Sequence, residues 1–224
     1  MIYLNAVVTR NFTAAELPGA VRAALGKPLR RAATLTQLAV VGALAGLPPE
    51  RRHLPTALLW QTTSGPRTET LNLLAEVCNG PAEPMPYDFL ATQPAIAAAQ
   101  LKPFLPGLQS ATCLPLADET AAHWSLLLCL ADNWLSAGRY AQILCAQLDH
   151  ASDSASGHWL ALSAAPLENS LASLQLTGTS PENGVPDTCD FPAHLSRWLA
   201  VDNSASLLLQ SAAGQVPAVE FART

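Results

Sequence analysis

The residues of this chain that could do chemistry are its cysteines and histidines. They are Cys78, Cys113, Cys129, Cys145 and Cys189, and His53, His123, His150, His158 and His194. The cysteines are odd in number and lack the short paired spacing of a metal site, and the histidines are dispersed, with no pair at helical spacing. Neither residue type therefore predicts a bound metal ion.

Two of the cysteines are candidates for a reactive thiol. Cys129 lies within an apolar helical run, which suits packing better than nucleophilic attack. Cys113, in the segment SATCLPL, is on or beside a strand and is the more accessible of the two. A cysteine is activated by a nearby base or helix N-terminus, whereas the acidic Asp118 and Glu119 would raise its pKa. The surroundings favour a structural role for Cys113, with a nucleophile as the alternative.

Other motifs of catalytic chemistry are absent from the sequence. There is no G-x-S-x-G nucleophile elbow, no G-x-G-x-x-G and no P-loop. The segment TTSG at residues 62–65 carries hydroxyl side chains but lacks the first glycine of a phosphate-binding loop. We interpret it as a capped turn between a strand and a helix.

The spacing of apolar residues predicts the elements that position these side chains. Strand-like runs cover residues 2–8, 56–60, 110–116, 140–148, 159–163 and 173–177, and helical spacing covers 30–47, 66–77, 94–105, 118–137 and 191–201. The proline-rich segment 80–91 and the polar segment 150–157 predict loops. The last two of these strands are expected to form a closing hairpin, and Pro115 confines its strand to a sheet edge or to the strand's own end. The pattern predicts one α/β domain over residues 1–224, a mixed β-sheet layered with helices.

The composition indicates a globular chain that does not bind nucleic acid. Half of the 224 residues are hydrophobic, 13% are charged, and the formal net charge is −5. A nucleic-acid-binding protein normally has a basic stripe, which this sequence lacks. The N-terminal segment has no signal-peptide pattern and no apolar run reaches about 18 residues, so we expect no membrane span and a cytoplasmic location.

Five segments, taken in order, resemble the N-terminal half of a β-ketoacyl synthase of the thiolase superfamily. They are LRRAATLTQLAVVGAL (29–44), TALLWQTTSGPRTETLNLL (56–74), PYDFLATQPAIAAAQL (86–101), ADNWLSAGRYAQILCAQLD (131–149) and HWLALSAAPLENSLASLQLTG (158–178). Their order and spacing carry the resemblance. The chain looks most like the short ketosynthase-like proteins called chain length factors, which occur in aryl polyene clusters. The resemblance implies a thiolase-like half, which is a truncated ketosynthase N-terminal domain.

The resemblance also implies that the catalytic cysteine of the family is missing. Counted back from Gly138, which ends the helix of the family's nucleophile, the position of that cysteine falls on Ala121. An alternative alignment matches SATC with the family's S-T-A-C and places the nucleophile at Cys113. The histidine partners of a working ketosynthase belong to a C-terminal half beyond this chain's length. The resemblance therefore implies a subunit without independent activity.

A chain length factor forms a heterodimer with a full-length ketosynthase, so the resemblance implies that partner here. An acyl carrier protein would present the acyl-phosphopantetheine on the partner, and this chain would hold no cofactor of its own. The implied interface strand contains Ser110, Ala111, Thr112, Cys113 and Leu114, because the corresponding strand pairs across thiolase-type dimers.

The acyl tunnel of such a heterodimer would be shaped here by Phe89, Ala121, His123 and Trp124, although these aromatic residues equally suit an ordinary core. Two other functions remain open from the sequence. One is an active thiol acyltransferase or hydrolase that uses Cys113, and the other is a stand-alone α/β scaffold protein.

Overall fold

The computed structural model describes residues 1–80, 83–116, 123–178, 184–202, 204–211 and 217–224. The strands are β1 (Ile2–Thr13), β2 (Thr56–Thr62), β3 (Leu108–Pro115), β4 (Gln142–His150), β5 (Ser154–Ser163), β6 (Ala172–Thr177), β7 (Ser206–Leu209) and β8 (Ala218–Arg223). The helices are α1 (Leu17–Leu25), α2 (Thr34–Gly46), the 3-10 turn η1 (Pro49–Arg51), α3 (Arg67–Asn79), α4 (Pro86–Ala91), α5 (Ala95–Leu101), α6 (Trp124–Ser136) and α7 (Phe191–Ala200). Among these residues, no helix is long and apolar enough to cross a membrane.

The described strands form one eight-stranded sheet in the order β3-β2-β4-β5-β1-β6-β8-β7. β2 is parallel to both β3 and β4, whereas the other neighbouring pairs are antiparallel. Parallel strands need long crossover connections, which contain α3 to α5 between β2 and β3, and α6 between β3 and β4. This arrangement confirms the mixed α/β fold, and it places β3 at an edge of the sheet, as Pro115 predicts.

The predicted hairpin between residues 159–163 and 173–177 is wrong. β1 lies between β5 and β6 and pairs antiparallel with both. β5 instead forms a hairpin with β4, so residues 154–157 of the predicted polar loop belong to a strand. A polar strand end is compatible with this position because an antiparallel pair can leave one face open to water. The polar composition of residues 150–157 therefore predicted a loop where the first residues of β5 lie.

Two helices also differ from the prediction. The proline-rich segment contains the short helix α4, which begins at Pro86. Proline is tolerated there because the first N–H groups of a helix have no intrahelical partner. The helix predicted from residue 118 begins at Trp124, since His123 has φ −127° and ψ 41°, which is not helical. The predicted first turn, residues 118–122, lies outside the described residues.

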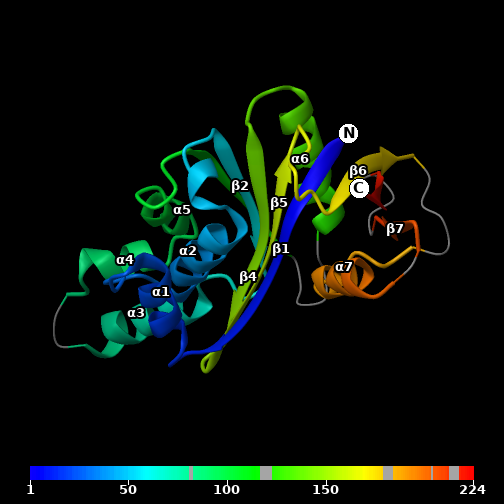
Figure 1. The fold of residues 1–224 in the computed structure, drawn as a ribbon. Helices are drawn as coiled ribbons and strands as arrows, with labels where there is room; N and C mark the ends of the chain where they lie inside the picture. Colours follow the sequence, from blue (N-terminus) through cyan, green and yellow to red (C-terminus); the bar gives the residue numbers. More distant parts are fainter. Residues whose placement is uncertain (81–82, 117–122, 179–183, 203, 212–216) are drawn as a thin grey trace.

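The two faces of the sheet carry separate hydrophobic clusters because side chains alternate along each strand. On β2, Ala57 and Leu59 pack with α6 and α7 on one face, whereas Leu58 and Trp60 pack with α1, α2 and α5 on the other. All seven residues of β2 are buried, as expected for a strand covered on both faces. Figure 1 shows α1 to α5 together on one side of the long strands, away from α7.

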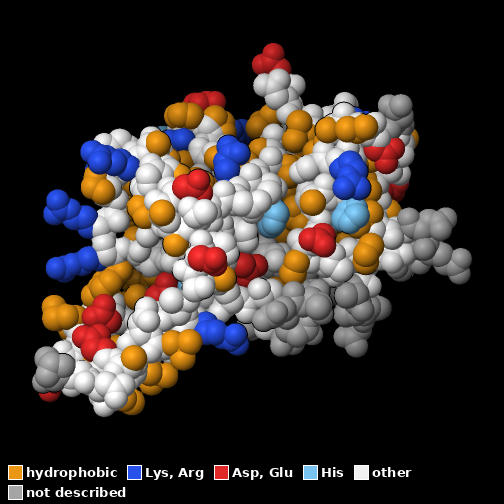
Figure 2. Space-filling model, turned by 90° about the horizontal axis from the view of Figure 1, so that it is seen from below, with side chains coloured by type: hydrophobic (Ala, Val, Ile, Leu, Met, Phe, Trp, Pro, Cys, Tyr) orange, Lys and Arg blue, Asp and Glu red, His pale blue; other side chains and the backbone are white. Residues whose placement is uncertain are grey.

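α3 and α4 lie together at a projecting corner of the molecule (Figure 1). Leu73 is the buried residue of α3, whereas Leu74 and Val77 on the same helix are 52% and 58% exposed. Phe89 on α4 is 63% exposed. Figure 2 shows hydrophobic side chains gathered on this corner. Such a gathering is uncommon on the surface of a monomer.

Candidate functional site

Polar side chains meet at the carboxyl ends of the parallel strands β2, β3 and β4. In α/β proteins, sites form at this edge of the sheet because the loops that leave the strands converge there. Here β2 runs into the turn of residues 62–65, β4 ends at Asp149 and His150, and α6 begins close by at Trp124. A carboxylate from the distant segment 184–190 joins this group.

The start of α6 is capped by Asp187, which is 6% exposed. Its Oδ1 accepts the N–H of Trp124 at 3.0 Å, and its Oδ2 accepts the N–H and the hydroxyl of Ser125 at 3.0 and 2.5 Å. Burial raises the pKa of Asp187, while hydrogen bonds from Ser125 and Trp124 oppose that rise. A helix N-terminus carries partial positive charge and attracts anions. At α6 this place is filled by a carboxylate of the chain itself.

A row of amide side chains joins the start of α6 to the end of β4. The N–H of His123 donates to Gln61 Oε1 at 2.9 Å, and Gln61 Nε2 donates to Gln147 Oε1 at 3.2 Å. Gln147 Nε2 then donates to Asp149 Oδ2 at 3.0 Å. Both glutamines are buried and face each other across β2 and β4. Amides do not titrate, so this row fixes the position of α6 and cannot exchange protons as an acid or base.

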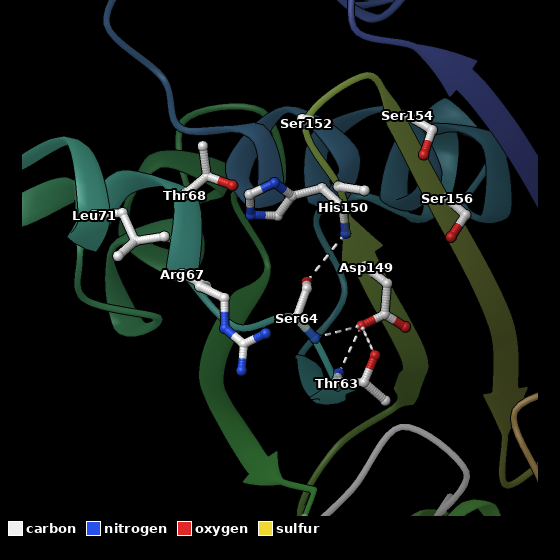
Figure 3. Close-up of a pocket in the computed structure, with 11 residues that line it drawn as sticks. Thr63, Ser64, Arg67, Thr68, Leu71, Asp149, His150, Ser152, Ser154 and Ser156 are labelled. Carbon is white, nitrogen blue, oxygen red and sulfur yellow. Dashed lines mark hydrogen bonds between the residues drawn. The ribbon is translucent and has the colours of Figure 1, made fainter.

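Asp149 holds the turn that follows β2 (Figure 3). Its Oδ1 accepts the N–H and hydroxyl of Thr63 at 2.6 and 2.8 Å, and the N–H of Ser64 at 3.1 Å. Burial alone would raise the pKa of Asp149, but the hydrogen bonds from Gln147, Ser64 and Thr63 outweigh it and lower the pKa. The interpretation of residues 62–65 as a hydrogen-bonded turn between a strand and a helix is confirmed, although no side chain caps α3 itself.

His150 links this turn to α3. Its Nε2 lies 3.1 Å from the carbonyl oxygen of Gly65 and 3.4 Å from Glu69 Oε2. The other oxygen of Glu69 accepts the N–H of Thr34 at the start of α2, at 3.3 Å. Burial acts to raise the pKa of Glu69, but its contacts with His150 and Thr34 prevail and lower it. His150 is therefore an ordered part of β4 rather than a loop residue.

The cysteines lack the surroundings of an activated thiol. Burial raises the pKa of Cys113 to about 11, and burial together with Asp132 raises that of Cys129. Cys145 is fully buried, and its pKa is raised for the same reason. Only the thiolate attacks, so these raised values disfavour a thiol enzyme that uses Cys113. Among the described residues, no three His, Cys, Asp or Glu side chains gather as they would around a metal ion.

The structure separates the residues predicted to shape an acyl tunnel. Trp124 is fully buried, with its ring centroid 6.1 Å from that of Phe191, and His123 is half-buried at the start of α6. Phe89 is exposed on α4, beyond the opposite face of the sheet from α6. Ala121 lies outside the described residues. The shared role of these four residues in a tunnel therefore stays a prediction.

The predicted interface strand is the least buried of the parallel strands. Residues 110–114 of β3 are all partly or fully exposed, and Ser110 Oγ donates to the hydroxyl of Tyr140 at 2.8 Å. Within the described part of the chain, β3 pairs with β2 alone, so the backbone groups of its other edge are open to a further strand. That geometry suits pairing across an interface, which remains a prediction.

Three residues of this site, Gln61, Gln147 and Asp187, were not predicted from the sequence. Gln61 and Gln147 follow the apolar runs TALLW and ILCA, and a polar residue in that position signals a buried partner, as it does here. Asp187 lies in a turn-rich connection between β6 and α7. Its local sequence gives no sign that it caps a helix 62 residues earlier.

Comparisons with known proteins rest on the fold. No protein-family model and no curated protein sequence matches the chain. A chain from the complex of the ketosynthase ApeO with its chain length factor ApeC, from Xenorhabdus doucetiae, is 14% identical at TM-score 0.57, with 99% of each chain covered. One from the ishigamide ketosynthase/chain length factor is 13% identical at TM-score 0.59, covering 91% of this chain and 84% of that one.

A third structure is AntDE:AntF, a type II polyketide synthase acyl-carrier protein in complex with its ketosynthase. The matching chain is 12% identical at TM-score 0.64, with 100% of this chain and 99% of that one covered. All three likenesses extend over nine-tenths or more of this chain. The chain therefore has the thiolase-like fold of the ketosynthases and their chain length factors.

Proposed function

We propose that this chain is a non-catalytic chain length factor, which pairs with a full-length β-ketoacyl synthase in polyene-like or fatty-acid-like synthesis. The observation that carries the proposal is the fold likeness over the whole chain to complexes of ketosynthases with chain length factors. Under this proposal the carrier protein delivers the acyl-phosphopantetheine to the ketosynthase, and the pair works in the cytoplasm.

The surroundings of α6 support the absence of catalysis. In a ketosynthase-like subunit, the resemblance places the nucleophile just before this helix, where the helix N-terminus would stabilise a thiolate. Here Asp187 accepts the first N–H groups of the helix, so these groups are not free to stabilise a thiolate. The raised pKa of Cys113 gives the rival thiol enzyme no support.

The open edge of β3 supports the mode of pairing. Its unpaired backbone groups offer a template for a strand of the partner. Ala111 is exposed on this strand, so a charge introduced there would be desolvated in the heterodimer.

Co-expression with a full-length ketosynthase from the same organism tests the proposal, with light scattering to give the stoichiometry. We expect a one-to-one complex whose affinity falls at least about tenfold in Ala111→Glu. The matched control is Ala193→Glu, because Ala193 is exposed in the first turn of α7, at the other end of the sheet. A chain that stays alone beside the ketosynthase contradicts the proposal. Equal weakening by both variants contradicts the role of β3.

A further inference from the structure

A cavity of about 400 Å³ lies beside the start of α3. Three segments that are distant in the sequence line it: α3, the end of β4, and the hairpin that leads into β5 (Figure 3). Its polar lining includes Arg67, Thr68, His150, Ser152, Ser154 and Ser156. Asp149 also lines the cavity and belongs to the row of contacts that holds α6, whereas the six residues just named do not.

Most of these polar groups have no partner within the protein. The guanidinium of Arg67 and the hydroxyls of Thr68, Ser152, Ser154 and Ser156 make no hydrogen bond or ion pair with a described residue. By contrast, Thr63 and Ser64 on the same wall are used by Asp149 and His150. Several free donors around one cavity are the usual arrangement of a site for a polar ligand.

His150 adds a buried nitrogen to this cavity. Its side chain is 2% exposed, and its ring points from the end of β4 toward Thr68 (Figure 3). Nε2 contacts the carbonyl oxygen of Gly65, which can only accept, so Nε2 carries the hydrogen of that bond. Nδ1 has no partner among the described residues and carries no hydrogen in the neutral ring, so it can accept a hydrogen bond from the P–OH group of a singly protonated phosphate.

The described lining of the cavity contains one cation, Arg67, and one carboxylate, Asp149. The carboxylate of Asp149 is occupied by Thr63, Ser64 and Gln147, and that of Glu69 faces His150 and the N–H of Thr34. Arg67 is exposed and remains the unpaired charge. A guanidinium presents several N–H groups in a planar fork that matches phosphate oxygens. No side chain caps α3, so its first N–H groups add partial positive charge, which the carboxylate of Glu69 in the same turn partly offsets.

We propose that this cavity binds the phosphate group of a phosphate ester, held by Arg67, His150 and the hydroxyls of β5. Leu71 lines the same cavity and is exposed, so it offers an apolar contact for the carbon chain next to the phosphate. A free phosphate-bearing metabolite and the phosphopantetheine arm of a carrier protein share this chemistry. The inference does not depend on pairing with a ketosynthase.

Isothermal titration of the isolated chain tests this site with inorganic phosphate, 4′-phosphopantetheine and pantetheine. We expect saturable binding of 4′-phosphopantetheine with a Kd of about 1 mM or tighter, and none of pantetheine, which lacks the phosphate. Tighter binding of 4′-phosphopantetheine than of inorganic phosphate identifies an ester of the pantetheine type. Equal binding of the two identifies the phosphate alone as the recognised group.

Two variants attribute the binding to this cavity. Arg67→Gln and the double variant Ser154→Ala with Ser156→Ala are each expected to weaken it by about tenfold. The matched control, Arg10→Gln, removes an exposed arginine from β1 and is expected to bind as the wild type does. Circular dichroism checks that each variant is folded. The absence of saturable binding, or equal binding by Arg67→Gln and the wild type, overturns the proposal.

Discussion

Asp187 caps the start of α6, next to Gln61, which accepts the N–H of His123. Asp187 accepts hydrogen bonds from the N–H groups of Trp124 and Ser125 and from the hydroxyl of Ser125. Without Asp187, these groups would be buried with no acceptor. An uncapped N-terminus costs about 1 kcal/mol, and buried groups left unsatisfied cost more. The same carboxylate occupies the N-terminus of α6, which under the proposed function is the helix that follows the missing nucleophile.

We expect Asp187→Ala to lower the free energy of unfolding by about 2–3 kcal/mol, because it leaves the N–H groups of Trp124 and Ser125 without an acceptor. Urea unfolding followed by tryptophan fluorescence measures the change. Asp153→Ala removes an exposed carboxylate from the β4–β5 turn and is the control, with a change within about 0.5 kcal/mol. Similar losses in both variants would contradict the role of Asp187 as a cap.

Asp187 also predicts a dependence of stability on pH. Its pKa is raised in the folded protein, so the native state keeps the proton to higher pH than the unfolded chain does. The stabilising contribution is complete below the unfolded pKa of about 4 and is lost as the pH rises through the native pKa. Asn does not titrate, so the stability advantage of the wild type over Asp187→Asn should shrink as the pH rises above about 4 and through the raised native pKa. Urea unfolding across a pH series measures it, and a constant difference argues against the raised pKa.

Cys113 is expected to react slowly with alkylating reagents. With a pKa of about 11, only about one thiol in a thousand is ionised at pH 8. Peptide mapping after brief treatment with iodoacetamide compares it with Cys78, which is exposed on the same chain. We expect Cys78 to be labelled first and the rate at Cys113 to rise with pH toward 11. Preferential labelling of Cys113 at neutral pH would revive the thiol-enzyme alternative.

At the scale of elements, Gly42 allows α2 to approach Trp159 of β5 closely. A Cβ atom on Gly42 would overlap the indole ring of Trp159. At Gly46, one turn later on the same helix, a Cβ would lie 3.5 Å from Leu144 Cδ2, which is an ordinary contact. The close approach of α2 to the sheet therefore depends on the first glycine and not on the second.

We expect Gly42→Ala to lower the free energy of unfolding by about 2–3 kcal/mol, because Trp159 or the helix must shift to relieve the overlap. Gly46→Ala is the matched control and should change stability by less than about 1 kcal/mol. Thermal and urea unfolding of the two variants measure the difference. A Gly42→Ala variant as stable as Gly46→Ala would show that α2 does not pack as described.

At the scale of the whole molecule, the corner formed by α3 and α4 exposes several large apolar side chains to solvent. Leu74, Val77 and Phe89 each leave more than half of their surface in contact with water. Exposed apolar side chains that gather on one corner drive association when no partner covers them. The isolated chain should therefore associate with itself as its concentration rises.

Replacing Leu74, Val77 and Phe89 with lysine should keep the chain monomeric without loss of stability. The three side chains gain little from folding, so the free energy of unfolding should stay within about 1 kcal/mol of the wild type. Sedimentation velocity over a concentration series measures the association. Val201→Lys changes an exposed residue beyond α7 and serves as the control. A wild type that stays monomeric throughout the series contradicts this reading of the corner.

Elements with local signals could be predicted from the sequence. The run TALLW predicts a fully buried strand, and β2 is buried along its whole length, because a strand covered on both faces must be apolar throughout. Pro115 predicts an edge, and β3 lies at one, because proline cannot complete a ladder on both sides. These signals depend on the backbone and side chain of one segment.

Contacts between distant segments could not be predicted in this way. The insertion of β1 between β5 and β6 replaced the expected hairpin, because adjacency in sequence does not fix which strand edges meet. Folding brings Asp187 to the start of α6. It also places Arg67 and Ser154 around one cavity. Hydrogen bonds and cavities form between groups that the complete chain brings together, and no local pattern of residues records those distances.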